Sequence, residues 1–326
     1  METHSKTGKG IGARLTRKED DRYMRGRGEF VADIRLAGMK DVAFLRSPLA
    51  HARLHGINVP ERLRDRVFTH DDMTGVRAIR AVTGLPGFKV SEQPPLATGK
   101  VRHVGELVAM CLGETRAEAE DVAAEIDVQF EELPVIVNML QGQRSDSPLV
   151  HEDWGDNIYL ESSFDGDLTE AKAAAAVTVT KEFRTNRQCM APLEGKGAVA
   201  YWDSRLEQLV VYTATQMPHI VRTGLAECLG LDQAKVRVIA PDVGGGFGYK
   251  GILTPEEICL GWLAMHCGHP VRWIEDCREH LTANANCREH HYHVTAYADA
   301  RGKILGLEAE ASVDAGAYSA YPFSAC

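Results

Sequence analysis

The sequence contains no run that approaches the roughly 18 consecutive apolar residues needed by a membrane-spanning helix. Its first 25 residues also lack the apolar core of a secretion signal and instead carry seven Lys and Arg side chains. We therefore expect a cytoplasmic protein in which residues 1–24 form a basic arm that is either solvated or bound to a partner. The formal net charge of −9 argues against the clustered basic surface of a nucleic-acid-binding protein.

Familiar metal and hydrolase motifs are absent too. None of the eight cysteines forms a Cys-x-x-Cys pair, and Cys267, Cys277 and Cys287 recur at a spacing too wide for a zinc or iron–sulfur site. We expect the cysteines to be reduced and mostly buried. For the histidine-rich residues 290–293 we favour a solvated strand over a metal site, and no residue is assigned as a direct metal ligand. A Gly-x-Ser-x-Gly motif is missing, which disfavours an α/β hydrolase.

The 326 residues that are present suffice for two domains, and their patterning predicts an α+β fold. Residues 25–138 are expected to form a first α/β domain that packs one core. Within it, Leu107–Leu112 is a buried strand, Thr115–Ile126 a helix with Thr115 as N-cap, and Asp127–Glu132 an alternating strand. The helix should bury one apolar stripe against the Leu107–Leu112 strand, formed by Ala119, Val122 and Ile126.

Residues 139–166 are rich in Gly, Ser, Asp and Asn and are predicted to form a linker. A second domain is expected over residues 167–326. Its alternating segments predict two hairpins, one between residues 197 and 212 and a longer one between residues 291 and 313. His219–Leu229 is predicted as a helix that Gly230 closes.

The most informative stretch is the glycine-rich run from Pro241 to Lys250, which reads Pro-Asp-Val-Gly-Gly-Gly-Phe-Gly-Tyr-Lys. An apolar strand, Lys235–Ala240, leads into it, and a helix is expected to begin near Thr254. A strand, a glycine turn and a helix can together form an anion cradle, because bare backbone exposes its N–H groups. The spacing matches neither a P-loop nor a dinucleotide fingerprint, and a purely structural turn is the alternative.

Together with this run, several segments in the same order resemble the molybdenum-cofactor-binding large subunits of the xanthine dehydrogenase, aldehyde oxidase and carbon monoxide dehydrogenase family. The resemblance covers nearly the whole chain. It rests on these segments: Arg17–Asp20 with Tyr23 and residues 26–33; Ser47–Ala52; Val101–Glu106 with Val108 and Ala109; Pro192 with Glu194; Thr215–His219; and Pro241–Gly248.

The resemblance implies a hammerhead-type α/β domain followed by an incomplete first molybdenum-cofactor-binding α+β domain. In this family a pterin dithiolene holds molybdenum, and carbon is hydroxylated with oxygen from water. By resemblance, Gln216 would hydrogen-bond an oxygen at the metal. The residues lining the pterin and molybdenum would be Gly245, Gly246, Phe247 and Gly248. An amide that only caps a turn is the alternative role for Gln216.

The same resemblance implies the cofactors and partners. The cofactor would be molybdopterin, with or without a cytosine dinucleotide. Iron–sulfur clusters and FAD would lie on a small iron–sulfur subunit and a medium FAD-binding subunit, and the substrate would be a small molecule. No nucleic-acid partner and no membrane span are expected.

Departures from the family pattern limit what the resemblance implies about the substrate and the catalytic residues. Gly251 stands where purine-oxidising members carry a substrate-contacting Glu, so an aldehyde or an aromatic heterocycle is the expected substrate. The family's general-base Glu would lie beyond residue 326, so no catalytic residue is assigned. Glu256 and Glu257 are expected to serve the start of a helix. The chain is therefore interpreted as the N-terminal portion of a hydroxylase large subunit that lacks its C-terminal half. The alternative is an inactive fragment or a cofactor-binding module.

Overall fold

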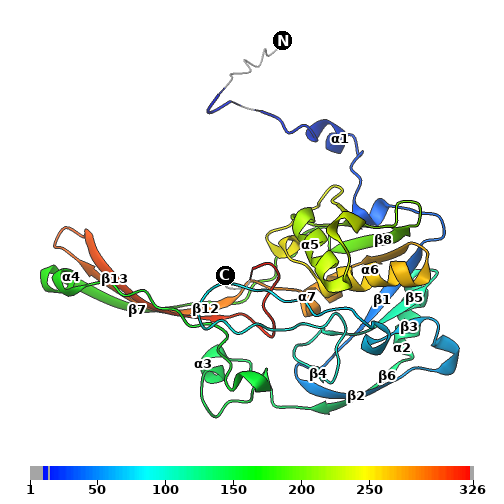
Figure 1. Cartoon of the computed structure of the whole chain (residues 1–326). Coiled ribbons are helices and arrows are strands. Elements are labelled where there is room, and N and C mark those ends of the chain that lie inside the picture. The colour runs from blue at the N-terminus through cyan, green and yellow to red at the C-terminus, as the bar shows by residue number, and fades with distance from the viewer. Residues whose placement is uncertain (1–9, 14, 324–326) are drawn as a thin grey trace, which may run out of the picture.

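The computed structural model describes residues 10–13 and 15–323 and contains three β-sheets with helices packed around them (Figure 1). The strands are β1 Lys40–Arg46, β2 Ala52–Asn58, β3 Val67–Phe68, β4 Lys100–Val101, β5 Leu107–Gly113, β6 Asp127–Glu132, β7 Val177–Thr185, β8 Gly197–Asp203, β9 Gln208–Thr213, β10 Val236–Ile239, β11 Val271–Ile274, β12 Glu289–Ala298 and β13 Ile304–Asp314. The α-helices are α1 Asp20–Met24, α2 Arg116–Ala124, α3 Met139–Gly142, α4 Thr169–Ala174, α5 Pro218–Leu229, α6 Pro255–Cys267 and α7 Cys277–Ala283.

The largest sheet has seven strands in the order β10-β9-β8-β11-β1-β5-β3. It joins both halves of the chain, because β1 pairs in parallel with β11 through Lys40 and Val271. Phe44 and Trp273 touch edge-to-face across this junction, with ring centroids 5.7 Å apart. One hydrophobic cluster contains Phe44 together with Leu209 and Ile258. The expectation that residues 25–138 pack a core of their own is therefore wrong, and the division into domains at those bounds stays a prediction.

The helix predicted after β5 is confirmed as α2. The Thr115 side chain accepts a hydrogen bond from the Glu118 N–H at the N-terminus of the helix. Ala119, Val122 and Ile126 are buried, and Val122 packs in a cluster with Ala109 and Cys111 of β5. The predicted strand after the helix is β6, which pairs with β2 in a separate three-stranded sheet.

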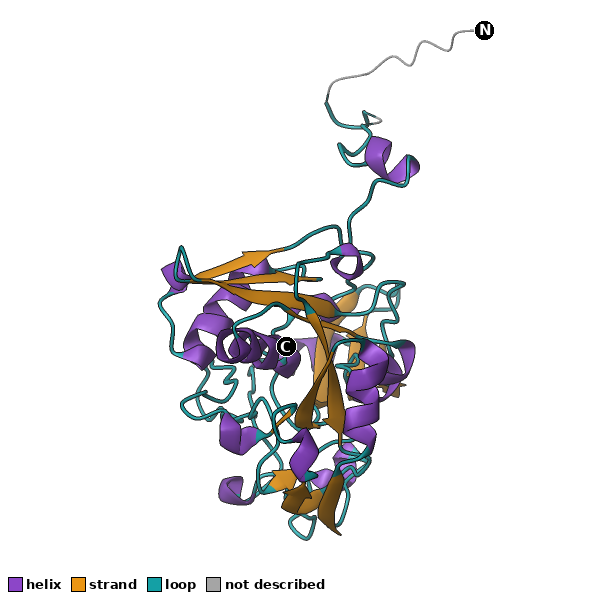
Figure 2. Ribbon diagram, turned by 90° about the vertical axis from the view of Figure 1, so that its right-hand side faces the viewer, coloured by secondary structure: helices purple, strands orange, loops and turns teal. Residues whose placement is uncertain are grey.

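The helices α5 and α6 lie against the large sheet (Figure 2). Both begin with a proline and end at a glycine in the left-handed conformation, Gly230 and Gly268. At the start of α6, Thr254 and Glu257 form a capping box. This local chemistry explains why α5 starts and stops, and why α6 starts, where the sequence predicts.

Strands β7, β12 and β13 form a third sheet that extends away from the rest of the molecule (Figure 1). The predicted long hairpin is confirmed as β12 and β13, but its pairing with β7 was not predicted. The predicted linker contains the short helix α3, so part of it is helical.

Two expectations about exposed groups can be checked in the described part of the chain. Cys111, Cys228 and Cys259 are buried, whereas three others are exposed, so the expectation of mostly buried cysteines is wrong there. His293 lies on β12 with a half-exposed side chain near Glu182, which confirms the strand. Across residues 10–13 and 15–323, no helix is both long and apolar enough to cross a bilayer.

Candidate cofactor site

The glycine-rich run follows β10 as a tight turn with unusual backbone angles. Gly245 has a φ of 101° and Gly248 a φ of 91°. Phe247 also lies in the left-handed region, at 51°, although it is not glycine, and its side chain is largely exposed. A non-glycine residue rarely adopts such a φ unless the surroundings hold it there. The surrounding residues therefore hold the backbone of this turn in one specific conformation.

Gln216 lies directly against this turn, as the sequence analysis predicts. Its side-chain oxygen accepts a hydrogen bond from the Gly248 N–H at 3.1 Å. Its own backbone N–H donates to the Lys250 carbonyl at 2.9 Å. A Cβ atom added at Gly246 would lie 2.5 Å from the Gln216 side chain, which is far inside contact distance. Gly246 is thus required for the close approach of Gln216 to the turn.

An ion pair between Glu194 and the buried Lys250 holds the turn in place. One carboxylate oxygen of Glu194 accepts a hydrogen bond from the Gly244 N–H at 2.7 Å and from the Lys250 ammonium at 2.7 Å. Lys250 is fully buried, and this burial lowers the pKa of its ammonium group. The other oxygen of Glu194 is buried and has no hydrogen-bond partner in the described part of the chain. Glu194 belongs to a recognisable motif of the sequence, but its pairing with Lys250 was not predicted.

The two glutamates at the start of α6 serve structure, as expected. Glu257 is fully buried and accepts a hydrogen bond from the Thr213 hydroxyl at 2.6 Å, besides its ion pair with Lys196 at 3.2 Å. Glu256 pairs with Arg46 at 3.0 Å. Carboxylates engaged by such fixed partners are poorly placed to serve as a general base.

At its other end the turn is tied to the N-terminal arm. Both terminal nitrogens of Arg22 donate to the Asp242 carboxylate, and the Tyr23 hydroxyl donates to it at 2.8 Å. The backbone N–H of Glu29 donates to the same carboxylate at 2.8 Å. The hydrogen bond from Arg22 holds the pKa of Asp242 well below its ordinary value. The arm is thus bound within the chain itself at this point, a contact that the sequence analysis missed.

The open side of the turn offers hydrogen-bond donors. The backbone N–H groups of Gly245, Gly246 and Phe247 make no hydrogen bond to any residue in the ranges 10–13 and 15–323. Nothing in those ranges lies within 4 Å of a Cβ atom placed on Gly248. Successive free N–H groups in a turn of mixed handedness form a concave donor array that suits a phosphorylated or otherwise anionic group. With the Gln216 amide beside them, these residues fit the polar, phosphate-bearing pterin expected here.

The site thus consists of a mixed sheet joined to a tight glycine turn, with the Gln216 amide held against that turn. Comparison with known proteins specifies the class. Residues 25–134 match the family described as "Aldehyde oxidase and xanthine dehydrogenase, a/b hammerhead domain". Residues 150–325, more than half of the chain, match the family described as "Molybdopterin cofactor-binding domain". The chain belongs to this family of molybdopterin-binding large subunits, and the resemblance seen in the sequence is confirmed.

Relatives with curated names include the nicotine 6-hydroxylase large subunit of Paenarthrobacter nicotinovorans, which is 35% identical over 96% of this chain. Among solved structures, quinoline 2-oxidoreductase from Pseudomonas putida 86 is 36% identical over 95% of the chain, with a TM-score of 0.90. The chain spans only 39% and 40% of these two proteins. It spans 68% of a third relative, the nicotinate dehydrogenase large molybdopterin subunit of Eubacterium barkeri, at 28% identity.

Proposed function

We propose that the turn from Gly245 to Gly248, together with Gln216, binds the molybdenum cofactor. The observation that carries this proposal is the row of free N–H groups at Gly245, Gly246 and Phe247 beside the Gln216 amide. When bound, the cofactor supplies the redox-active metal centre of the family's hydroxylation chemistry. The chain's own part would be to hold and orient it: the backbone N–H groups would donate hydrogen bonds, and the Gln216 amide would hydrogen-bond an oxygen of the bound group.

We further propose that the chain is the N-terminal portion of a hydroxylase large subunit. Its substrate would be an aldehyde or an aromatic heterocycle, since Gly251 leaves no carboxylate at the position expected to contact a purine. Heterocycles appear in the names of the nicotine and quinoline enzymes to which the chain is similar. Iron–sulfur and FAD-binding subunits, and polypeptide equivalent to the remaining length of the relatives, would complete the assembly. A cytosine dinucleotide form of the cofactor belongs to the same proposal.

An inactive fragment is the competing interpretation, because the chain spans about 40% of most relatives described above. The nicotinate dehydrogenase subunit supports the interpretation as part of a hydroxylase, since the chain covers 68% of that protein. A molybdopterin subunit can therefore be much shorter than the nicotine and quinoline relatives. In either case we expect residues 1–326 alone to show no hydroxylase turnover with aldehydes or heterocycles, because Glu256 and Glu257 are held by Arg46, Lys196 and Thr213. Turnover by the isolated chain would contradict this assignment.

Metal retention tests the cofactor site. The chain is co-expressed with candidate partner subunits in a host that makes molybdenum cofactor, and molybdenum is measured per purified chain. Gly246→Val should lower that content at least tenfold, because the new side chain would collide with Gln216 and block the approach to the backbone. Gly166→Val is the matched control, since an added Cβ there meets no atom within 4 Å, and its molybdenum content should stay within twofold of wild type. Equal metal in both variants would overturn the proposal.

A further inference from the structure

The sheet formed by β7, β12 and β13 has two chemically different faces. The register places Val179 of β7 opposite Ala296, and Leu307 of β13 opposite the same residue. Residues that face each other across antiparallel strands point to the same side. We call this side the open apolar face, and define it by six of its side chains: Val177, Val179, Phe183, Val294, Leu307 and Val313. Lys181 lies on the same side, opposite Val294.

The open apolar face is exposed along its length. Val177, Val179, Phe183 and Leu307 have relative exposures of 48%, 46%, 54% and 56%. β7 has nine residues, so the face is roughly 30 Å long and about 10 Å wide across three strands. Single exposed apolar residues are ordinary, but a contiguous patch of a few hundred Å² marks a binding surface.

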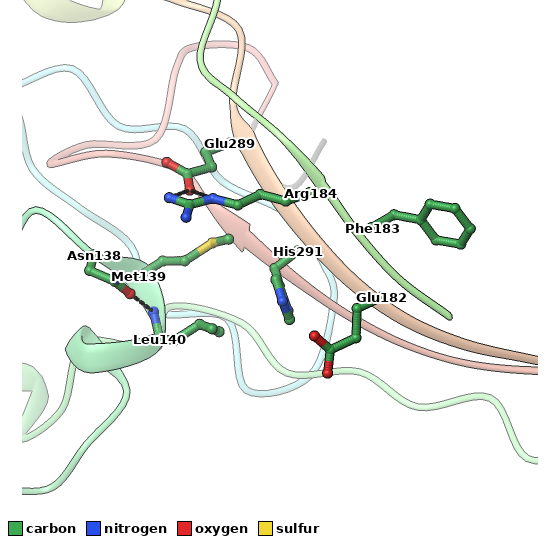
Figure 3. A pocket seen from close by; sticks show the side chains of 8 residues that line it. All are labelled: Asn138, Met139, Leu140, Glu182, Phe183, Arg184, Glu289 and His291. Atoms are coloured by element: carbon green, nitrogen blue, oxygen red, sulfur yellow. Dashed lines mark hydrogen bonds and ion pairs between the residues drawn. The ribbon is translucent and has the colours of Figure 1, made fainter. Parts of the chain in front are cut away.

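The opposite face is polar, and the chain covers it with its own elements. Lys172 of α4 pairs with Glu308 at 3.1 Å. From the predicted linker, Gln143 donates to the Ser312 hydroxyl at 3.0 Å. Figure 3 shows a cavity beside α3 with His291 and Glu182 on the polar side, while Phe183 points the other way. An antiparallel sheet ordinarily packs its apolar face and leaves the polar face in water, so this sheet shows the reverse arrangement.

The segment that leaves β7 connects this sheet to the candidate cofactor site. The chain leaving β7 is held by the Cys287 N–H, which donates to the Gln188 carbonyl at 2.9 Å. Pro192 then reaches the glycine turn, where its Cβ lies 3.2 Å from a Cβ placed on Gly245. The sheet that carries the open apolar face is therefore joined to the turn by a short segment, which runs from Thr185 at the end of β7 to Pro192.

We propose that the open apolar face is the docking surface for the polypeptide equivalent to the part of the relatives' large subunits that lies outside their match to this chain. The inference rests on the proposed function and adds where that polypeptide binds. The matched relatives supply the reason for this occupant, since about 60% of the nicotine 6-hydroxylase subunit lies outside the match. Burying these valine, leucine and phenylalanine side chains would remove the patch from water, which is the main driving force for such association.

A charge placed on one face or the other of the same strand tests the inference. The tagged full chain is co-expressed with a separate polypeptide, the part of the nicotine 6-hydroxylase large subunit outside the matched 39%, and the co-purified amount is measured. Val179→Glu with Phe183→Glu should lower capture at least tenfold. Thr178→Glu with Thr180→Glu puts the same charges on the polar face of β7, and capture should stay within twofold of wild type.

Three outcomes would overturn the inference: no capture by the wild-type chain, equal loss with both pairs of substitutions, or self-association of the chain that only the apolar-face pair abolishes. Circular dichroism of each variant checks folding, and a photo-crosslinking residue at position 183 reports the contact without added charge. A crosslink to the supplied polypeptide is the expected result. Molybdenum content separates the two proposals, because a complex that forms without metal would contradict the proposed function alone.

Discussion

At the residue scale, Asp242 connects the N-terminal arm to the glycine turn across 220 positions of sequence. Its carboxylate receives Arg22, Tyr23 and the Glu29 N–H, so it is fully engaged just before the turn begins. A carboxylate with charged and neutral donors around it is stabilised in its ionised form. Asp242 therefore fixes one end of the segment that we assign to cofactor binding.

The stability of the chain should depend on pH through Asp242. Its folded-state pKa lies below the ordinary value of about 3.9, so its contribution is present above that pH and is lost as the pH falls through the folded-state pKa. The free energy of unfolding of wild type should therefore fall more steeply than that of Asp242→Asn between about pH 5 and pH 2. Urea denaturation at a series of pH values measures both slopes.

The exposed Asp165 provides the control for this measurement. Asp165→Asn should retain the wild-type slope and its stability at neutral pH, whereas Asp242→Asn should be the less stable variant at pH 7. Parallel slopes for wild type and Asp242→Asn would show that the arm does not hold this carboxylate in solution.

At this scale, the contacts that could be predicted are those of residues in recognisable sequence motifs. The resemblance to the molybdenum-cofactor-binding family implies that Gln216 lies at the glycine turn, and the Gly248–Gln216 hydrogen bond confirms that the two are neighbours. The pairs Arg22–Asp242 and Glu194–Lys250 could not be predicted, since nothing local indicates which distant charge a buried or clustered side chain will meet.

At the element scale, α2 depends on one buried stripe. Val122 is 3% exposed and packs against β5, so Val122→Ala should lower the free energy of unfolding by about 1–3 kcal/mol. Val137 is 84% exposed, and Val137→Ala should change stability by less than about 0.5 kcal/mol. Denaturant unfolding compares the two. Equal, small effects would mean that α2 does not pack on β5 as described.

Helices and hairpins were predictable because their signals are local. Thr115 and Thr254 mark helix starts, Gly230 marks a helix end, and alternating residues mark β12 and β13. The parallel pairing of β1 with β11 was not predicted, because the two strands lie more than two hundred residues apart and neither sequence indicates its partner. The expectation that residues 25–138 pack a separate core was wrong for the same reason.

At the scale of the whole molecule, one sheet unites both halves, while the sheet formed by β7, β12 and β13 extends away from the rest of the molecule (Figure 1). The turn itself supplies backbone donors and one amide, and its nearby carboxylates are held by Lys and Arg partners. This arrangement suits a subunit that holds a cofactor and relies on further polypeptide for catalysis.

An experimental structure of the chain in complex with partner subunits and loaded with molybdenum cofactor would test the proposed cofactor site. We predict the pterin cofactor against the Gly245–Gly248 turn, with the Gln216 side-chain amide within about 3.2 Å of an oxygen on the metal or the cofactor. A cofactor bound elsewhere, with the N–H groups of Gly245, Gly246 and Phe247 facing only water or protein, would contradict it.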